Sequence, residues 1–411
     1  MNDVNTQPFL LEQALSTVTA ILPRNSAQRV VSAITRWREE SSAFVWDARG
    51  TLLHEAWYKQ FLPSISPAKA MIQLILPDNE VDRMLSVIVD AGRLDLQSTG
   101  SVFCTPCDDV YFGAGFRRWP VDHGQDIVDG SHDLQENLDV ITYIVEPHRT
   151  EAIARAAIKA GSHGPIIYFG EGRGLRDRLG WLRITKQPLK EVVTVVVDSS
   201  DADAVFAAMA KAGQVHLPGR GFMYRIPVEK GMFNLPSVVA QHHYAANMQQ
   251  IINAIDRLNG HSHWRDQEVF SVGDEGKGAG MDIHGRVNKV TEQRQVCKHA
   301  IVRRNESDQM IDEFLKAGAR GINVSHVRHE TGDEETPLQS TGLTLEYSVL
   351  RCVMGEEDAI DVAARVAQSA AAAGLQDVCL FRQPVMQVAT YTPGANEFRQ
   401  RGRAAENPRS T

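Results

Sequence analysis

Cysteine is scarce in this sequence: five residues are scattered among 411, which makes no disulfide framework and is typical of a reducing compartment. A basic excess is also missing, because 43 Lys and Arg against 51 Asp and Glu leave a net charge of −8. That balance disfavours a nucleic-acid partner. No apolar run approaches the roughly 20 residues of a membrane-spanning helix, and the N-terminus lacks the basic cluster of a secretory signal. We therefore expect a cytoplasmic globular protein that does not itself span a membrane.

What the sequence does contain is an internal repeat. Six short apolar runs, beginning near residues 18, 71, 140, 192, 296 and 345, are each followed by a polar turn and then by apolar residues at helical spacing. The polar turns supply Ser, Asp, Asn or Thr residues that cap helices, and glycines such as Gly161 and Gly318 suit the helix ends. A second strand is expected after each helix, at residues 43–47, 102–105, 166–169, 222–226, 322–327 and 378–381.

The six units form three pairs, because first and second copies start 71 − 18 = 53, 192 − 140 = 52 and 345 − 296 = 49 residues apart. A strand–helix–strand unit repeated in tandem predicts a four-stranded antiparallel sheet with two helices on one face, the ferredoxin-like α+β fold. We place three such domains at 14–115, 137–235 and 294–393, with a linker at 116–136, a helical and glycine-rich insertion at 236–293 and a disordered tail at 394–411. The alternative, one doubly wound sheet, is disfavoured because no helix separates the second strand of a unit from the next strand.

Two glycine-rich stretches mark the middle domain. One spans residues 170–174 (Gly-Glu-Gly-Arg-Gly) and the other residues 218–221 (Pro-Gly-Arg-Gly). Glycine turns let backbone N–H groups approach a phosphate as an anion nest, and nearby cations add charge-assisted hydrogen bonds. The candidate binding residues are Gly170, Gly172, Arg173, Gly174, Lys190, Gly219, Arg220 and Gly221. We expect the two stretches to lie close together, with the three cations directed into one cleft; the alternative is that both are tight turns of the fold and nothing more.

Residues 138–235 resemble PII signalling proteins along their full length. The residues that carry the resemblance are the 170–174 stretch, at the base of that family's long T-loop, and the 218–221 stretch, at its glycine-rich B-loop. The resemblance implies an adenine nucleotide bound between neighbouring subunits, with ADP, AMP, ATP and cyclic AMP all open. Phe222 replaces the family's lysine after the B-loop, and no arginine pair follows, which favours a mono- or diphosphate.

The outer domains match the family by order more than by motif. The first keeps Ala48-Arg49-Gly50 and Ser98-Thr99-Gly100, whereas the third has Arg328-His329-Glu330 and Gly374-Leu375-Gln376-Asp377 in the corresponding places. Ordinary PII proteins assemble as homotrimers, so three domains in one chain imply an intrachain pseudo-trimer. Exchange of domains between chains is the competing possibility.

Catalytic and metal motifs are not found. Cys104 and Cys107 have C-x-x-C spacing without a second pair, which favours a structural role, and no nucleophile elbow or zinc-protease motif is present. We expect a non-enzymatic regulator that senses an adenine nucleotide. Its T-loops at 48–69, 172–190 and 328–344 would contact a protein partner, such as a membrane transporter or a metabolic enzyme. The alternatives are an amino-acid-binding regulator of the ACT type and a ligand-free interaction scaffold.

Overall fold

The computed structural model describes residues 9–12, 14–37, 42–51, 68–96, 100–116, 118, 132, 134–174, 189–233, 294–319, 321–331 and 346–391. Within these ranges, three segments repeat the order strand–helix–strand–strand–helix–strand. The first segment consists of β2 (Leu15–Pro23), α1 (Arg24–Trp37), β3 (Ser42–Gly50), β4 (Ala68–Pro77), α2 (Asp78–Gly92) and β5 (Ser101–Gly113). The second consists of β6 (Leu138–Val145), α3 (Thr150–Lys159), β7 (His163–Gly174), β8 (Leu189–Asp198), α4 (Ala202–Gly213) and β9 (Phe222–Val228).

The third segment consists of β11 (Gln295–Arg303), a 3-10 turn η5 (Arg304–Glu306), α8 (Ser307–Lys316), β12 (Gly321–Thr331), β13 (Glu346–Gly355), α9 (Glu356–Ala372) and β14 (Val378–Val385). Short strands flank the segments: β1 (Phe9–Glu12), β10 (Lys230–Phe233) and β15 (Gln387–Thr390). No helix in the described part of the chain is long and apolar enough to cross a bilayer.

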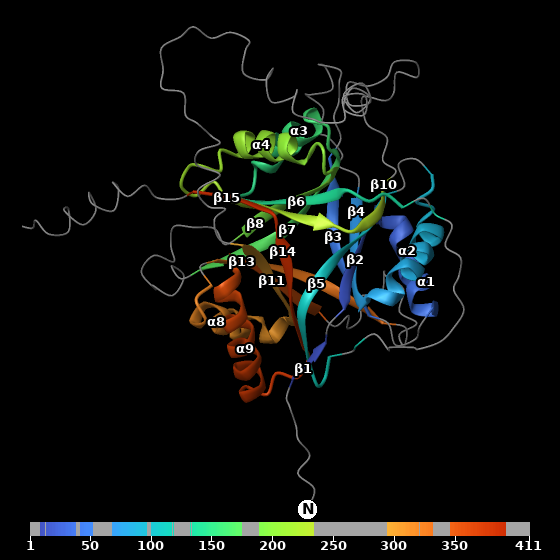
Figure 1. The fold of residues 1–411 in the computed structure, drawn as a ribbon. Coiled ribbons are helices and arrows are strands. Elements are labelled where there is room, and N and C mark those ends of the chain that lie inside the picture. The colour runs from blue at the N-terminus through green and yellow to red at the C-terminus, as the bar shows by residue number, and fades with distance from the viewer. Residues whose placement is uncertain are drawn as a thin grey trace, which may run out of the picture.

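Each segment orders its strands in the same way. The orders are β5-β2-β4-β3, β9-β6-β8-β7 and β14-β11-β13-β12, and all neighbouring strands are antiparallel. The predicted mixture of helices and antiparallel strands is therefore confirmed, and the doubly wound parallel sheet is excluded. Figure 1 shows the helix pairs α1/α2, α3/α4 and α8/α9 on three outer sides of the molecule, with the strands between them.

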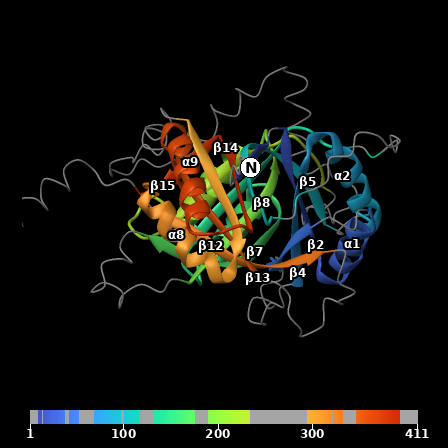
Figure 2. The same cartoon turned by 90° about the horizontal axis from the view of Figure 1, so that it is seen from below.

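Strand pairing also joins the segments in a cycle. Strand β10, after the second segment, pairs with β5 of the first, and β15, after the third segment, pairs with β9 of the second. The second half of β5 in turn pairs with β14 of the third segment. Strands β3, β7 and β12, one from each segment, also pair with one another. In the view from below, α8/α9 and α1/α2 lie on opposite sides of these strands (Figure 2).

These additional pairings explain where strands run past their predicted ends. Strand β5 continues beyond Thr105 to Gly113 because its second half pairs with β1 and β14. Strand β7 continues through Gly174 because it pairs with β12. Only residues at the ends of the predicted T-loops are described, and all of these except Thr51 lie in strands. The insertion at 236–293, the tail at 394–411 and most of the linker at 116–136 lie outside the described residues.

Both faces of the sheet are buried. Separate cores lie under each helix pair, formed for example by Val30 and Ile34 of α1 with Leu74 of β4. A further core on the helix-free faces combines residues of all three segments, among them Trp46 and Tyr168. Burial on both faces explains why β8 is apolar from Val192 to Val197, apart from Thr194, instead of alternating.

Candidate functional site

The glycines at 170–174 lie in a strand, so the predicted turn there is wrong. Glu171 pairs with Leu189 of β8 on one side and with Val324 of β12 on the other. Gly170, Gly172 and Gly174 all lack the positive φ with which glycine usually supplies the alternating conformation of an anion nest. These backbone groups belong to the sheet and form no phosphate nest.

Close approach of neighbouring groups accounts for two of these glycines. A Cβ on Gly170 would lie 2.7 Å from the Asn323 amide nitrogen on β12. A Cβ on Gly172 would lie 3.0 Å from Cε of Lys190, whose side chain crosses over that glycine. Gly170 therefore permits the contact between β7 and β12, and Gly172 makes room for Lys190.

The second glycine-rich stretch is the tight turn that was predicted. Gly219 and Gly221 have φ values of +77° and +100°, in the left-handed region that favours glycine. A Cβ on Gly221 would lie only 2.2 Å from the carbonyl oxygen of Ile144. The Tyr143 hydroxyl donates a hydrogen bond to the carbonyl oxygen of Arg220 at 3.0 Å, and this bond holds the turn against β6.

Tyr143 is a site residue that the sequence pattern does not single out. Its ring is fully buried, and a Cβ on Gly213 would lie 2.2 Å from its hydroxyl oxygen. Burial raises the pKa of Tyr143, and the positive charge of Arg149 opposes that rise. Arg149, just before α3, is thus a second cation near the turn, in addition to Arg220. In the sequence, Pro147 and His148 before Arg149 indicate only the start of a helix and no binding site.

Lys190 and the turn lie at the same end of the second segment. Lys190 pairs with Gly170, and its ammonium lies 3.6 Å from Glu146. The register Val145–Glu191 and Ile144–Phe222 places Glu146 between Lys190 and the turn at residues 219–221. Two cations thus flank one carboxylate across the strand ends. Arg220 forms no ion pair with any described residue.

The two glycine-rich stretches do not meet. The turn precedes β9, and β8 and β6 lie between β7 and β9, so the stretches are three strand spacings apart, roughly 14 Å. Arg173 also lies on the other face of the sheet from Lys190, because Gly172 faces Lys190 and side chains alternate along a strand. The prediction that Arg173, Lys190 and Arg220 share one cleft is therefore wrong.

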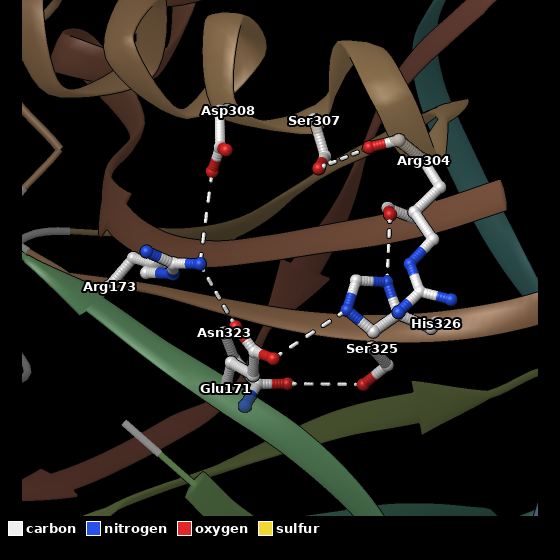
Figure 3. Close-up of polar contacts among 9 residues, drawn as sticks. Glu171, Arg173, Arg304, Ser307, Asp308, Asn323, Ser325 and His326 are labelled. Atoms are coloured by element: carbon white, nitrogen blue, oxygen red, sulfur yellow. Dashed lines mark hydrogen bonds and ion pairs between the residues drawn. The ribbon is translucent and has the colours of Figure 1, made fainter. Parts of the chain in front are cut away.

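Arg173 instead lies at the boundary with the third segment (Figure 3). Its guanidinium is 3.1 Å from Glu171 and 3.8 Å from Asp308 at the start of α8. Glu171 is also 3.7 Å from His326 of β12, which shares a 3.0 Å hydrogen bond with Ser348. Figure 3 shows Glu171 between Arg173 and His326. This cluster connects the second and third segments, and in it the Arg173 guanidinium is paired with the carboxylates of Glu171 and Asp308.

The position of Gly221 holds a glycine in the first and second segments and an aspartate in the third. Gly100 precedes β5 as Gly221 precedes β9, has a φ of +144°, and approaches the carbonyl of Ile21 as Gly221 approaches that of Ile144. In the third segment the corresponding residue is Asp377. Its carboxylate accepts hydrogen bonds from Tyr347 at 2.5 Å and from Arg303 at 2.7 Å. The third segment therefore places its own carboxylate at this position.

The cysteines form no site. All five thiols are free and buried, and Cys104 and Cys107 belong to different cores on opposite faces of β5. Among the described residues, no group of three or more His, Cys, Asp or Glu side chains is arranged to hold a metal ion.

No family model matches the chain, and no curated protein matches it in sequence. Among solved structures, the chain is similar to PII of Arabidopsis thaliana bound to citrate, at 18% identity over 24% of this chain and 80% of that one, with a TM-score of 0.19. It is also similar to aspartate kinase from Synechocystis, at 9% identity over 91% of this chain and 44% of that one, with a TM-score of 0.19.

A third similar structure is the ligand-free regulatory subunit of aspartate kinase from Thermus thermophilus, at 11% identity over 50% of this chain and 95% of that one, with a TM-score of 0.17. Such TM-scores carry no argument about this chain. Its architecture rests on its own strand pairing.

Proposed function

We propose that this chain is a regulatory, non-enzymatic protein of three ferredoxin-like, PII-like domains in an intrachain pseudo-trimer, which binds an adenine nucleotide at a domain boundary. The cyclic strand pairing is the observation that carries the proposal. Each segment contributes a strand to the segment before it in the cycle, through β10 with β5, β15 with β9 and β5 with β14. A trimer of separate chains would exchange strands in the same way around a threefold axis.

Arginines near the ends of the second strands link the three segments in the opposite direction around the cycle. Arg49 of the first segment is 2.9 Å from Glu191 of the second, and Arg173 of the second is 3.8 Å from Asp308 of the third. Arg328 of the third segment binds Asp47 of the first through two hydrogen bonds of 3.1 and 3.2 Å. In all three ion pairs the arginine of one domain binds a carboxylate of the following domain, and this regular order supports closure of the three domains within one chain.

The turn at Gly219–Gly221 is the best phosphate site in this proposal. It combines two left-handed glycines with Arg220, and Arg149 and Lys190 lie at the same end of the segment. Thr390 of β15 pairs with Phe222, directly after the turn, so the third domain forms one wall of the site. In the third domain, Asp377 fills the corresponding position with a carboxylate, which disfavours a phosphate there.

Isothermal titration calorimetry of the full chain against ATP, ADP, AMP, cyclic AMP and a panel of amino acids tests the proposal. We expect saturable binding of at least one adenine nucleotide. Binding of an amino acid alone would support the ACT-type alternative. If no adenine nucleotide or amino acid binds at millimolar concentration, the proposed sensor is wrong and the scaffold replaces it.

A further inference from the structure

Arg351 of β13 is a buried cation without a counter-charge. Only 7% of its surface is exposed, and no described carboxylate lies within ion-pair distance of it. One guanidinium nitrogen donates to the Tyr168 hydroxyl at 2.8 Å. The guanidinium carbon lies 5.3 Å from the centre of the Trp46 ring and 5.8 Å from that of Tyr168. Trp46, Tyr168 and Arg351 come from the first, second and third segments, so this cation lies where all three meet.

Two further polar side chains of this interior lack partners. His299 of β11 is the direct register neighbour of Arg351 and is 3% exposed, and neither ring nitrogen has a hydrogen-bond partner among the described residues. The amide nitrogen of Gln383 donates to the hydroxyls of Thr17 and Thr105, and the nearby Gln383 side chain opposes the lowering of the His299 pKa. Trp46, 1% exposed, likewise has an unpaired indole N–H.

The interior thus holds unpaired hydrogen-bond donors and one positive charge, beside the unpaired amide oxygen of Gln73 on β4. Burial and the nearby Arg351 lower the pKa of His299 well below its usual value, so the imidazole is neutral and offers one N–H. A buried charge is costly unless an opposite charge or hydrogen bonds compensate it, and the two aromatic rings supply only part of that compensation. A guanidinium that is weakly hydrated and carries five donors is well suited to an anion.

We infer that the helix-free interior between the three segments holds one small monovalent anion, in the size range of chloride or formate, bound by Arg351 with Trp46 and His299 as neighbouring donors. This site is separate from the turn at Gly219–Gly221 and does not depend on nucleotide binding. Its role is structural: the anion neutralises the one cation that all three segments enclose. The same charge could come from a halide or from a small carboxylate, and the experiment distinguishes these sources.

The test begins with native full-length protein that has been exhaustively desalted into a buffer free of small anions. The protein is then denatured, and released anions are quantified by ion chromatography. We expect about one anion per chain from the wild type, identified as halide or carboxylate by its elution, and almost none from Arg351→Gln. In parallel, chloride, formate and nitrate are titrated into desalted protein, and the midpoint of thermal unfolding should rise at millimolar anion concentration for the wild type only.

Arg225→Gln is the matched control. Arg225 is 8% exposed, as buried as Arg351, but it pairs with Asp139 at 2.6 Å and Asp203 at 2.7 Å. This variant should release one anion per chain like the wild type. If Arg351→Gln does not fold, Arg351→Lys, which keeps the charge, should retain a weakened midpoint response. The inference is overturned if wild-type protein releases no stoichiometric anion, or if the midpoints of Arg351→Gln and wild type respond equally to all three salts.

Discussion

Arg49, in the first segment, donates to the carboxylate of Glu191, in the second, across 2.9 Å, and the Glu191 side chain is only 7% exposed. The other oxygen of that carboxylate accepts a 2.7 Å hydrogen bond from Thr150 at the start of α3. A nearly buried carboxylate of one segment is therefore neutralised by an arginine of another. This contact makes the stability of the second segment depend on the first.

Removal of Arg49 should consequently destabilise the whole chain. Arg49→Met leaves the Glu191 carboxylate buried with only the Thr150 hydroxyl, which should lower the free energy of unfolding by about 1–3 kcal/mol at neutral pH. Urea denaturation measures the loss. Arg155→Met is the control, because Arg155 and Glu151 form an exposed pair on α3, for which we expect less than about 0.5 kcal/mol. Adding Glu191→Gln to Arg49→Met should restore part of the stability; a double variant no more stable than the single one contradicts this account.

A second prediction separates backbone strain from close approach at glycine. Gly221 and Gly318 have nearly equal φ values, +100° and +105°, but a Cβ on Gly318 would meet nothing within 4 Å. Gly318→Ala should therefore cost only the left-handed strain, about 1–2 kcal/mol. Gly221→Ala adds a clash with the Ile144 carbonyl and should cost about 2–5 kcal/mol. Equal losses in urea denaturation would show that the turn relaxes around the added methyl group.

These glycines also show how much of the site the sequence predicts. The same Gly-x-Gly motif occurs at 170–172 and at 219–221. The first pair of glycines makes room for Asn323 and Lys190, whereas the second pair provides left-handed φ angles. Glycine serves both purposes, so local sequence does not distinguish a strand from a turn. The difference is set by β12, which pairs with β7 from more than 140 residues away in the chain.

The same limit applies to the fold. Apolar spacing within 30 residues predicts each strand–helix–strand unit, because the helix stripe and the strand are both buried locally. The extension of β5 to Gly113 depends on β14 and β1, and nothing near Asp109 or Tyr111 signals those partners. Arg351 is likewise unremarkable in sequence, since its burial results from three segments meeting around it.

Lys298 gives a pH-dependent prediction. It is 3% exposed on β11, and burial, with Arg382 on the neighbouring strand, lowers its pKa to about 8, although Asp109 and Asp108 of β5 oppose the shift. Between pH 8 and the usual lysine value of 10.5, the unfolded chain binds a proton that the folded chain does not, so stability rises with pH in that window and the penalty is complete below pH 8. Lys298→Met should thus raise the free energy of unfolding at pH 7 by up to about 3 kcal/mol.

The advantage of Lys298→Met over the wild type should shrink as pH rises from 8 to 10.5, because the wild type loses its penalty over this window as the unfolded lysine approaches its own pKa. Urea denaturation at half-unit pH intervals follows the difference. Lys159→Met, at an exposed position of α3, should show no such trend. A gain for Lys298→Met that stays constant across the window would mean that packing, and not the charge, is responsible.

The thiols should be unreactive in the folded protein. All five cysteines are buried, and burial raises the pKa of Cys104 and Cys297 to about 12, so almost no thiolate exists at neutral pH. Ellman's reagent should label no thiol in native protein and five after denaturation in guanidinium. Rapid labelling of Cys104 or Cys107 in native protein would contradict the burial of β5 and reopen a role for the C-x-x-C pair.

The proposed phosphate site makes the last prediction. Arg220 lies between the two left-handed glycines and has no ion pair with a described residue, so no described carboxylate competes with a ligand for its charge. A charge-assisted hydrogen bond to phosphate contributes about 1.5–3 kcal/mol, and Arg220→Ala should therefore weaken nucleotide binding roughly ten- to hundredfold in calorimetry. The control is Gln376→Ala in the corresponding turn of the third segment, where Asp377 already occupies the site; its affinity should equal that of the wild type. Because the Arg220 carbonyl, and not its side chain, holds the Tyr143 hydroxyl, Arg220→Ala should keep the turn and the thermal stability. Unchanged affinity in a folded Arg220→Ala protein that still binds nucleotide would move the phosphate site away from this turn.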